Sequence, residues 1–314
     1  MKQAQSSTPL FLNGDLRPVN PINKLRYLVY HHYRNKRENT VPFEREIPWP
    51  TKLADYAPAL NSMSFEGTPS RILCNVFWSL VDWEAIRQDL GDLAFHDIGC
   101  GSGWYSDLIR KYTGFEIKYH GYDVIENNKW KEFENKSTKF STYDGHSFGS
   151  TFSDNPNIFI SQSALEHIPN DLGFFRAVSE YSSDRDCIVQ IHMVPGATGL
   201  RQWRLHGWRQ YNRDMLRRIR DLLGDDMEMT VFCLGGSEIV DLHVKWIHNK
   251  HRRRSIGGNP AQRNIYKAEW LRAMEVCTPA GADEASFLAI VIEKGLSTPL
   301  WPRLLRTSAA NLVD

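Results

Sequence analysis

The sequence predicts an α/β protein built on a doubly wound, mostly parallel sheet, and three observations support this. A compact apolar strand runs into a glycine-rich turn and then a helix within residues 93–110. Apolar runs of strand length then alternate with helical segments up to about residue 196. A late apolar run at residues 287–293 reads F-L-A-I-V-I-E, which suits a strand inside a sheet. This alternation is typical of parallel sheets that carry helices on both faces.

The glycine-rich turn is the first candidate binding element. Residues 97–103 read D-I-G-C-G-S-G, and a helix is expected to begin at Trp104. Gly99, Gly101 and Gly103 lack Cβ atoms, so the backbone there can come close to a ligand. The N-terminus of the following helix would present free N–H groups and a partial positive charge to a carboxylate or phosphate. The turn therefore predicts a nucleotide-like cofactor.

The acid that follows the turn narrows the choice of cofactor. The second predicted strand, about residues 116–122, ends at Asp123, whose carboxylate can accept hydrogen bonds from ribose hydroxyls. The dinucleotide pattern G-x-G-x-x-G would need glycine where the chain has Trp104. The pattern D-x-G-x-G-x-G, with the later acid, resembles motif I of the class I S-adenosylmethionine-dependent methyltransferases. The resemblance covers about residues 93–196 and, more weakly, 227–235 and 286–294.

The resemblance implies a Rossmann-like sheet of seven strands with the last strand antiparallel. It also implies S-adenosyl-L-methionine as the cofactor, bound at the ends of the first four core strands. The predicted cofactor-binding residues are Asp97, Gly99, Cys100, Gly101, Gly103, Asp123, Asp144, Gly145, Ser161 and Gln162. In that family an acid at the position of Asp144 meets the exocyclic amine of adenine. An ordinary turn is the alternative interpretation of Asp144-Gly145.

Residues 161–171, S-Q-S-A-L-E-H-I-P-N-D, follow the predicted fourth strand. They resemble the LEH-(I/V)-P segment of family members that methylate small molecules, and they lack the D/N-P-P-Y/F motif of nucleobase amine methylation. His167 is the first candidate for the base that takes a proton from an acceptor hydroxyl, and His192, at the end of the fifth strand, is the second. A local turn and cap before the next helix would also explain Glu166 and His167. A hydrogen-bonded core residue would explain His192.

Residues 200–211 are dense in aromatic and basic side chains. Indole faces can stack on sugars, and arginines can form paired hydrogen bonds with carboxylate or phosphate. The predicted substrate-binding residues are Glu166, Arg201, Trp203, His206, Arg209 and Tyr211. The segment resembles an "HGYRQY"-like stretch of methyltransferases associated with bacterial surface-polysaccharide synthesis, which implies a sugar acceptor, free or carrier-linked. The alternative is an amphipathic helix whose solvated basic face continues to Arg220.

The composition limits the partners that the chain could have. Hydrophobic residues make up 41% of the chain, charged residues 24%, and the net charge is +1, which gives no global electrostatic case for nucleic acid. The five cysteines include no C-x-x-C pair, which disfavours zinc and disulfide frameworks and suits a reducing cytoplasm. No compact carboxylate/histidine ligand set is readable, so no metal ligands are predicted, and metal-assisted transfer remains an open alternative. No apolar run reaches signal-peptide or membrane-span length.

Residues 1–66 are interpreted as an N-terminal extension with a helix at 25–37, and residues 67–314 as the methyltransferase domain. Within that domain, 93–196 form the cofactor-binding core and 197–285 an insertion before the last strand. The predicted function is methyl transfer to a hydroxyl of a small molecule, in the cytoplasm. The basic run at 250–254 is expected to form solvated surface. The alternatives are a contact with anionic lipid at the inner membrane face or with a phosphate of the substrate. The alternatives are an RNA or protein methyltransferase that uses residues 201–220 and 250–254, and a non-catalytic S-adenosylmethionine-binding subunit.

Overall fold

The computed structural model describes residues 12–15, 20–38, 41–49, 60, 63–278 and 281–300. Its strands form one sheet. They are β1 (Glu46–Trp49), β2 (Ala94–Ile98), β3 (Lys118–Asp123), β4 (Thr138–Thr142), β5 (Ile158–Gln162), β6 (Ile188–Pro195), β7 (Glu228–Leu234) and β8 (Phe287–Lys294). The predicted core strands are therefore present, each within about two residues of its expected ends.

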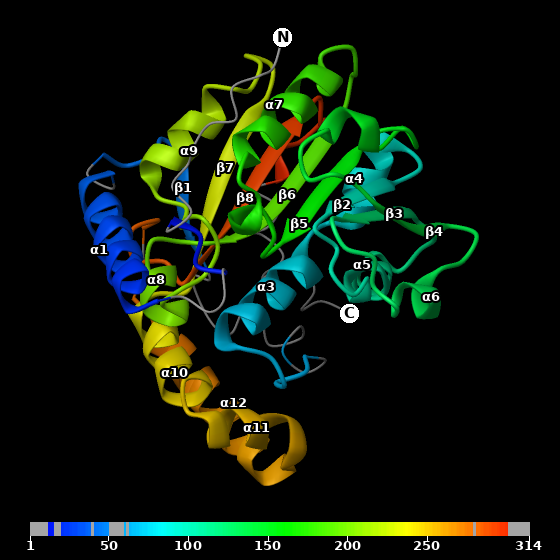
Figure 1. Ribbon diagram of the computed structural model, residues 1–314. Helices are drawn as coiled ribbons and strands as arrows, with labels where there is room; N and C mark the ends of the chain where they lie inside the picture. The colour runs from blue at the N-terminus through cyan, green and yellow to red at the C-terminus, as the bar shows by residue number, and fades with distance from the viewer. Residues whose placement is uncertain are drawn as a thin grey trace.

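The sheet has the order β1-β7-β8-β6-β5-β2-β3-β4 (Figure 1). Its neighbouring strands are parallel except β8, which runs antiparallel to both β6 and β7. The predicted doubly wound, mostly parallel sheet with an antiparallel last strand is thus confirmed. The described sheet has eight strands rather than seven, because β1 adds to the edge beside β7. Pro48 made this segment look irregular in the sequence, but proline is tolerated on an edge strand.

Helices cover both faces of the sheet (Figure 1). They are α1 (Pro21–Glu38), α3 (Pro69–Leu80), α4 (Trp83–Leu90), α5 (Trp104–Thr113), α6 (Trp130–Phe133), α7 (Asp171–Ser182), α8 (Gly199–Trp203), α9 (Arg213–Arg220), α10 (Ser237–Ile247), α11 (Lys250–Gly258) and α12 (Pro260–Glu275), with 3₁₀ helices η3 (Phe148–Thr151) and η4 (Leu165–His167). Helices α10, α11 and α12 project from the sheet as an arm at the lower left of Figure 1. Among the described helices, none combines the length and apolarity that a bilayer crossing requires.

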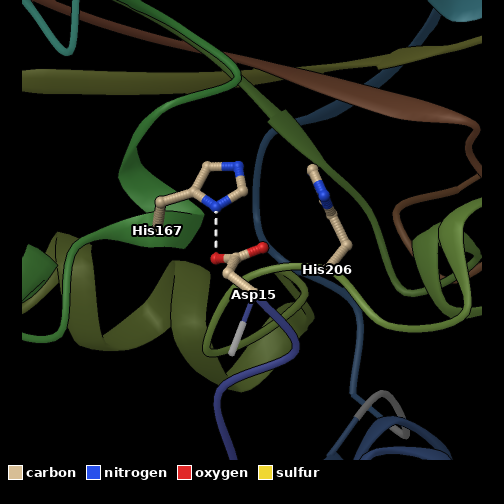
Figure 2. A group of neighbouring side chains, drawn as sticks. All are labelled: Asp15, His167 and His206. Carbon is tan, nitrogen blue, oxygen red and sulfur yellow. Dashed lines mark hydrogen bonds and ion pairs between the residues drawn. The ribbon is translucent and has the colours of Figure 1, made fainter. Parts of the chain in front are cut away.

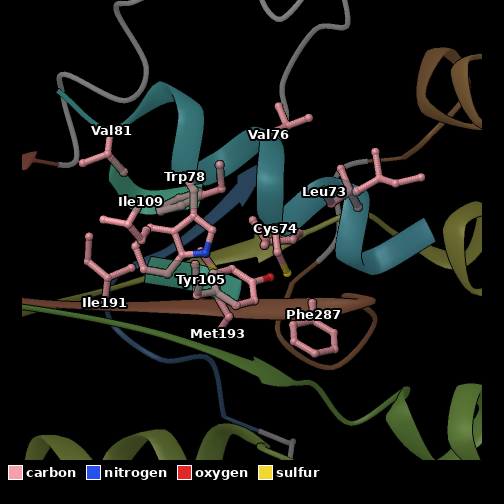
Figure 3. Packing of buried hydrophobic residues seen from close by; sticks show 14 of the residues in the cluster. Leu73, Cys74, Val76, Trp78, Val81, Tyr105, Ile109, Ile191, Met193 and Phe287 are labelled. Carbon is pink, nitrogen blue, oxygen red and sulfur yellow. The ribbon is translucent and has the colours of Figure 1, made fainter. Parts of the chain in front are cut away.

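The core is divided by the sheet into two layers. Side chains of a strand point alternately to opposite faces, so Ala289 and Val291 of β8 join the layer that includes α3 and α5. Leu288 and Ile290 join the layer that includes α7 and α9. Figure 3 shows the first layer, where Trp78 of α3 lies near side chains of β6. This alternation decides which side chains at the strand ends reach a given site.

The described parts of the N-terminal segment pack onto the domain. In α1 the Tyr27 hydroxyl donates to the carbonyl of His206 at 2.7 Å. In β1 the Glu46 carboxylate pairs with Arg213 at 2.7 Å, and this contact lowers the Glu46 pKa against the opposing effect of burial. The segment predicted as an extension therefore supports the 206–213 loop and the start of α9.

The insertion differs from its predicted form. Residues 201–220 are not one helix, because α8 ends at Trp203 and α9 begins only at Arg213. Helix α9 is amphipathic as expected, with Met215, Leu216 and Ile219 buried. Helix α11 continues through Gly257 and Gly258, which read as part of a glycine- and proline-rich loop in the sequence. The side chain of Asn259 then caps the following helix, α12.

Candidate functional site

The glycine turn after β2 is closely packed against β3 and the segment after β5. The N–H groups of Gly99 and Cys100 donate to the carbonyl of Tyr122 at 2.7 and 3.0 Å. Gly99 has φ +74°, and a Cβ placed there would lie 2.4 Å from the Cβ of Ala164. Both the backbone conformation and the close approach therefore require glycine. Helix α5 follows without a side-chain cap from its N-cap residue Gly103 in the described part of the chain, so the start of the helix can face a ligand.

Asp123 lies directly beside this turn, as the sequence predicted. Its Oδ2 accepts from the N–H of Gly101 at 2.8 Å, and its Oδ1 accepts from the N–H of Val124 at 2.8 Å. Three exposed apolar side chains occupy the same end of the sheet: Trp104 is 47% exposed, Val124 53% and Ile125 73%. The sequence analysis did not identify these three residues as a group. They provide apolar surface next to a carboxylate, which suits a nucleoside base and its ribose.

Asp97 lies beneath the turn and is buried. Its Oδ2 accepts a hydrogen bond from the hydroxyl of Tyr119. Burial raises the Asp97 pKa to about 7 against the opposing effect of that hydrogen bond. Its Oδ1 is buried and has no hydrogen-bond partner among the described residues. An unpaired buried carboxylate oxygen is costly, and an ammonium group of a ligand would satisfy it.

Asp144 lies in a turn that its own carboxylate closes, and its predicted adenine contact stays a prediction. Its exposed carboxylate accepts hydrogen bonds from the N–H groups of His146 and Ser147 and from the Ser147 hydroxyl. These bonds lower the Asp144 pKa to about 2. The alternative interpretation, an acid that closes its own turn, explains the geometry. Gly145, at φ +78°, does lie close to Val124 and so borders the apolar side chains near the turn.

His192 and Ser161 face the wrong layer for the predicted roles. Strand alternation directs both side chains toward α7, where the Ser161 hydroxyl and the His192 Nδ1 share a hydrogen bond of 2.9 Å. The His192 ring is fully buried between Phe174 and Phe175. Burial lowers its pKa to about 3, so the imidazole is neutral at ordinary pH. The core-residue interpretation of His192 therefore replaces the catalytic one.

Gln162 faces the opposite layer and reaches a hollow. The cavity has a volume of about 470 Å³. Its lining comprises Glu66, Gly67, Thr68, Ser70, Arg71, Gln162, Ser163, Trp203, His206, Ile247, Arg253, Ile256 and Phe287. Three of the predicted site residues, Gln162, Trp203 and His206, therefore share one cavity near the carboxyl ends of β5 and β6, where ligands of such sheets bind.

Two guanidinium groups line this cavity. Arg71 of α3 donates to the hydroxyl of Tyr105 at 2.9 Å. Burial lowers the Arg71 pKa, but the contact with Tyr105 outweighs it and raises that pKa above its ordinary value. Arg253 of α11 is exposed and forms no ion pair with any residue that the structure describes. The indole of Trp203 stacks on His206 with ring centroids 5.3 Å apart. The cavity therefore offers aromatic surface from Trp203 and two cations. The sequence pointed to Arg253 only through its basic run and did not point to Arg71.

A cluster of acids and histidines includes His206, which also lines the cavity (Figure 2). Nδ1 of His167 lies 2.6 Å from Oδ2 of Asp15. Glu166 is completely buried, and its Oε1 lies 3.3 Å from Nε2 of His206 and 3.7 Å from Nε2 of His167. Burial lowers the His167 pKa, but the Asp15 hydrogen bond and nearby carboxylates outweigh it and raise that pKa above its ordinary value. Asp15 was not predicted as a site residue, because it lies 152 residues from His167 in the chain.

Three predicted substrate-binding residues lie elsewhere. Arg201 pairs with Asp241 and lines a separate open hollow with His32 and Lys36. Arg209 binds Asp171 and the carbonyls of Ile168 and Pro169. Tyr211 is fully buried, and its hydroxyl donates to Asp171 at 2.6 Å. Arg209 and Tyr211 thus tie the loop before α9 to the start of α7, and their predicted contact with substrate is wrong.

A further hollow of about 440 Å³ lies along β2, β3 and β4, with His120, Lys139 and Asp154 in its lining. It extends over the amino-terminal halves of β2 and β3, from Ala94 and Lys118 onward. Ligands of doubly wound sheets bind beyond the carboxyl ends of the strands. We therefore assign the functional site to the glycine turn and the Arg71–Arg253 cavity.

No protein-family model matches the chain, and no curated protein matches it significantly. Solved structures with a similar backbone include a SAM-dependent methyltransferase from Archaeoglobus fulgidus, with 16% identity over 76% of this chain and 100% of the other and a TM-score of 0.42. Phosphoethanolamine N-methyltransferase 2 of Haemonchus contortus has 12% identity over 67% of this chain and 51% of its own, with a TM-score of 0.39. The [4+2]-cyclase SpnF has 12% identity over 68% of this chain and 80% of its own, with a TM-score of 0.41. Likeness at this level leaves reaction and ligand to be argued from the chain's own residues.

Proposed function

We propose that this protein transfers a methyl group from S-adenosylmethionine to a hydroxyl of a small anionic, sugar-like acceptor. The observation that carries the proposal is the adjacency of two sites at one end of the sheet. The glycine turn with Asp97 and Asp123 ends β2 and β3, and the cavity with Arg71 and Arg253 begins at the end of β5. Because β2 pairs directly with β5, a donor at the first site lies beside an acceptor in the second.

The residues at the turn fit this cofactor group by group. The unpaired Oδ1 of Asp97 would accept from its ammonium, and the Asp123 carboxylate from its ribose hydroxyls. Val124 and Ile125 would cover its adenine ring. When bound, S-adenosylmethionine supplies a methyl group already activated by the sulfonium. The chain must then orient the acceptor oxygen and remove its proton, and such orientation can lower the barrier by up to about 7–11 kcal/mol.

The acceptor class follows from the cavity wall. Trp203 adds aromatic surface to the cavity wall, against which a sugar ring can pack, and the two guanidinium groups suit a carboxylate or phosphate. Arg253→Ala is expected to raise the KM for an acidic acceptor about tenfold, since a hydrogen bond to a charged group is worth about 1.5–3 kcal/mol. The affinity for S-adenosylmethionine should not change. Tritiated-methyl transfer to nucleotide-linked and lipid-linked sugars, acidic and neutral, provides the measurement.

The matched control for this prediction is Arg254→Ala, a neighbouring exposed arginine of α11 outside the cavity lining. If Arg253→Ala and Arg254→Ala give the same KM, the anionic acceptor must be abandoned. Transfer to RNA or protein and to none of the sugars would favour the alternative substrate classes. Absence of transfer to every acceptor by a protein that binds the cofactor would favour a non-catalytic subunit.

His167 is the proposed proton acceptor. The Asp15 carboxylate holds its Nδ1, which orients the ring and, against the effect of burial, raises the imidazole pKa. Its Nε2 lies 3.7 Å from Oε1 of Glu166, and the ring of His206, which lines the cavity, packs against it. His167→Ala is expected to lower kcat by about 10²- to 10⁴-fold, the usual contribution of general base catalysis. Single-turnover methyl transfer measures this directly. His251→Ala, an exposed histidine on α11, should keep full activity, and wild-type turnover by the His167 variant would exclude it as the base.

A further inference from the structure

We infer that Asp15, His167 and His206 form a binding site for a divalent transition-metal ion, with Glu166 as a fourth oxygen donor. Each of the first three residues offers one ligand atom, and these atoms lie within 4.8 Å of one another. Figure 2 shows the three side chains gathered around a common space, although they come from the N-terminal segment, η4 and the loop after α8.

Glu166 supplies an independent observation. Its side chain has no exposed surface, and its Oε2 has no hydrogen-bond partner among the described residues. Nε2 of His206 is likewise buried without a hydrogen bond, 3.3 Å from Oε1 of the same carboxylate. Leaving these groups unsatisfied is costly. Ligand atoms of a tetrahedral zinc site with bonds of about 2.0–2.1 Å lie roughly 3.3 Å apart, so the 3.3 Å between His206 and Glu166 fits a shared ion. Oδ2 of Asp15 and Nδ1 of His167 lie 2.6 Å apart as a hydrogen-bonded pair, so they must separate before both can bind the ion.

The ligand-bearing segments are held together before any ion binds. The N–H of Gly14 donates to the carbonyl of Gly207 at 2.7 Å, and the N–H of Gly207 donates to Oδ1 of Asp15 at 3.1 Å. The N–H of Trp208 donates to the carbonyl of Glu166 at 2.7 Å. Trp203 stacks on the imidazole of His206 and restricts its rotation. This arrangement lowers the entropic cost of ion binding.

The donor set indicates the kind of ion. Two imidazoles with carboxylates favour zinc, iron, cobalt or nickel over magnesium and calcium, which prefer oxygen donors. The two carboxylates carry the charge that a divalent ion balances. His206 lines the cavity, so the ion would face the acceptor, a role that rests on the proposed function. A nitrogen that binds the ion cannot also accept a proton. The base role proposed for His167 therefore belongs to the metal-free protein, and in the metal-bound protein the ion would lower the pKa of the acceptor hydroxyl instead.

Titration of the metal-free protein with Zn²⁺, without cofactor or acceptor, tests the inference. We expect one ion per chain at micromolar affinity or tighter, no comparable binding of Mg²⁺, and a Co²⁺ derivative with the visible absorption of a four- or five-coordinate site. His206→Ala should weaken Zn²⁺ binding by about 100-fold or more and Asp15→Asn by about 10- to 100-fold. His251→Ala should bind Zn²⁺ as the wild type does.

The circular dichroism of each variant confirms that it is folded, and the Co²⁺ spectrum needs no variant at all. If the wild type binds no Zn²⁺ at a concentration of about 100 μM, the site is overturned. Equal affinity in the His206 and His251 variants would do the same. Neither result depends on methyl transfer, so a protein that binds the ion but not S-adenosylmethionine would reject the proposed function and leave the metal site standing.

Discussion

Gly99→Ala is expected to weaken S-adenosylmethionine binding by more than about 100-fold. The new Cβ would lie 2.4 Å from the Cβ of Ala164, and φ at this position is +74°. Real side chains cannot approach so closely, so the turn must move away from η4. That movement displaces the N–H of Gly101 from Asp123. Isothermal titration calorimetry measures the affinity.

Gly91→Ala is the matched control for this prediction. Gly91 has φ +73°, but no atom lies within 4 Å of a Cβ placed there. The two variants therefore share the backbone strain and differ in the collision. In the double variant Gly99→Ala/Ala164→Gly, the removal of the opposing methyl should restore part of the affinity. Equal cofactor binding by Gly99→Ala and Gly91→Ala would show that the packing of the turn is not what binds the ligand.

Asp171→Ala is expected to destabilise the protein by about 3–5 kcal/mol, because it leaves a buried guanidinium without its partner. Asp171 is 2% exposed, pairs with Arg209 and accepts from the hydroxyl of Tyr211. The comparison is Asp241→Ala, which removes the exposed partner of Arg201 and should cost about 1 kcal/mol or less. Urea unfolding gives both free energies. Equal losses would contradict the structural role assigned to Arg209 and Tyr211.

The cofactor side of the site was predictable because its parts are local in sequence. The turn at 97–103 and Asp123 lie on adjacent parallel strands, so strand order alone brings them together. The antiparallel last strand came from the family resemblance, and the sheet confirms it. The extra strand β1 was missed, because Pro48 hides a short edge strand from any pattern of alternation.

The acceptor side was only partly predictable. Trp203 and His206 reach the cavity, whereas Arg209 and Tyr211 turn inward to Asp171. Sequence alone does not separate an arginine that binds substrate from one that neutralises a buried acid, since both need the same residue type. His192 failed for a different reason. Strand alternation decides to which side of the sheet the His192 side chain points, but the sequence does not show which helices cover that side. The structure shows that α7 covers it.

The long-range contacts could not be predicted at all. Asp15 reaches His167 across 152 residues of chain, and Arg71 meets Arg253 in one cavity only because α3 and the helical arm lie side by side. No periodicity or motif spacing encodes such pairs. The proposed anionic acceptor and the inferred metal site both rest on these long-range contacts. Both proposals therefore depend on the tertiary structure.

The most direct test of the account is a calorimetric titration of S-adenosylmethionine into the folded wild-type protein, with and without an acidic sugar acceptor. The account predicts one binding site per chain, with binding that Gly99→Ala abolishes and Gly91→Ala retains. A folded wild-type protein that shows no binding under either condition would contradict the central claim that the glycine turn holds this methyl donor.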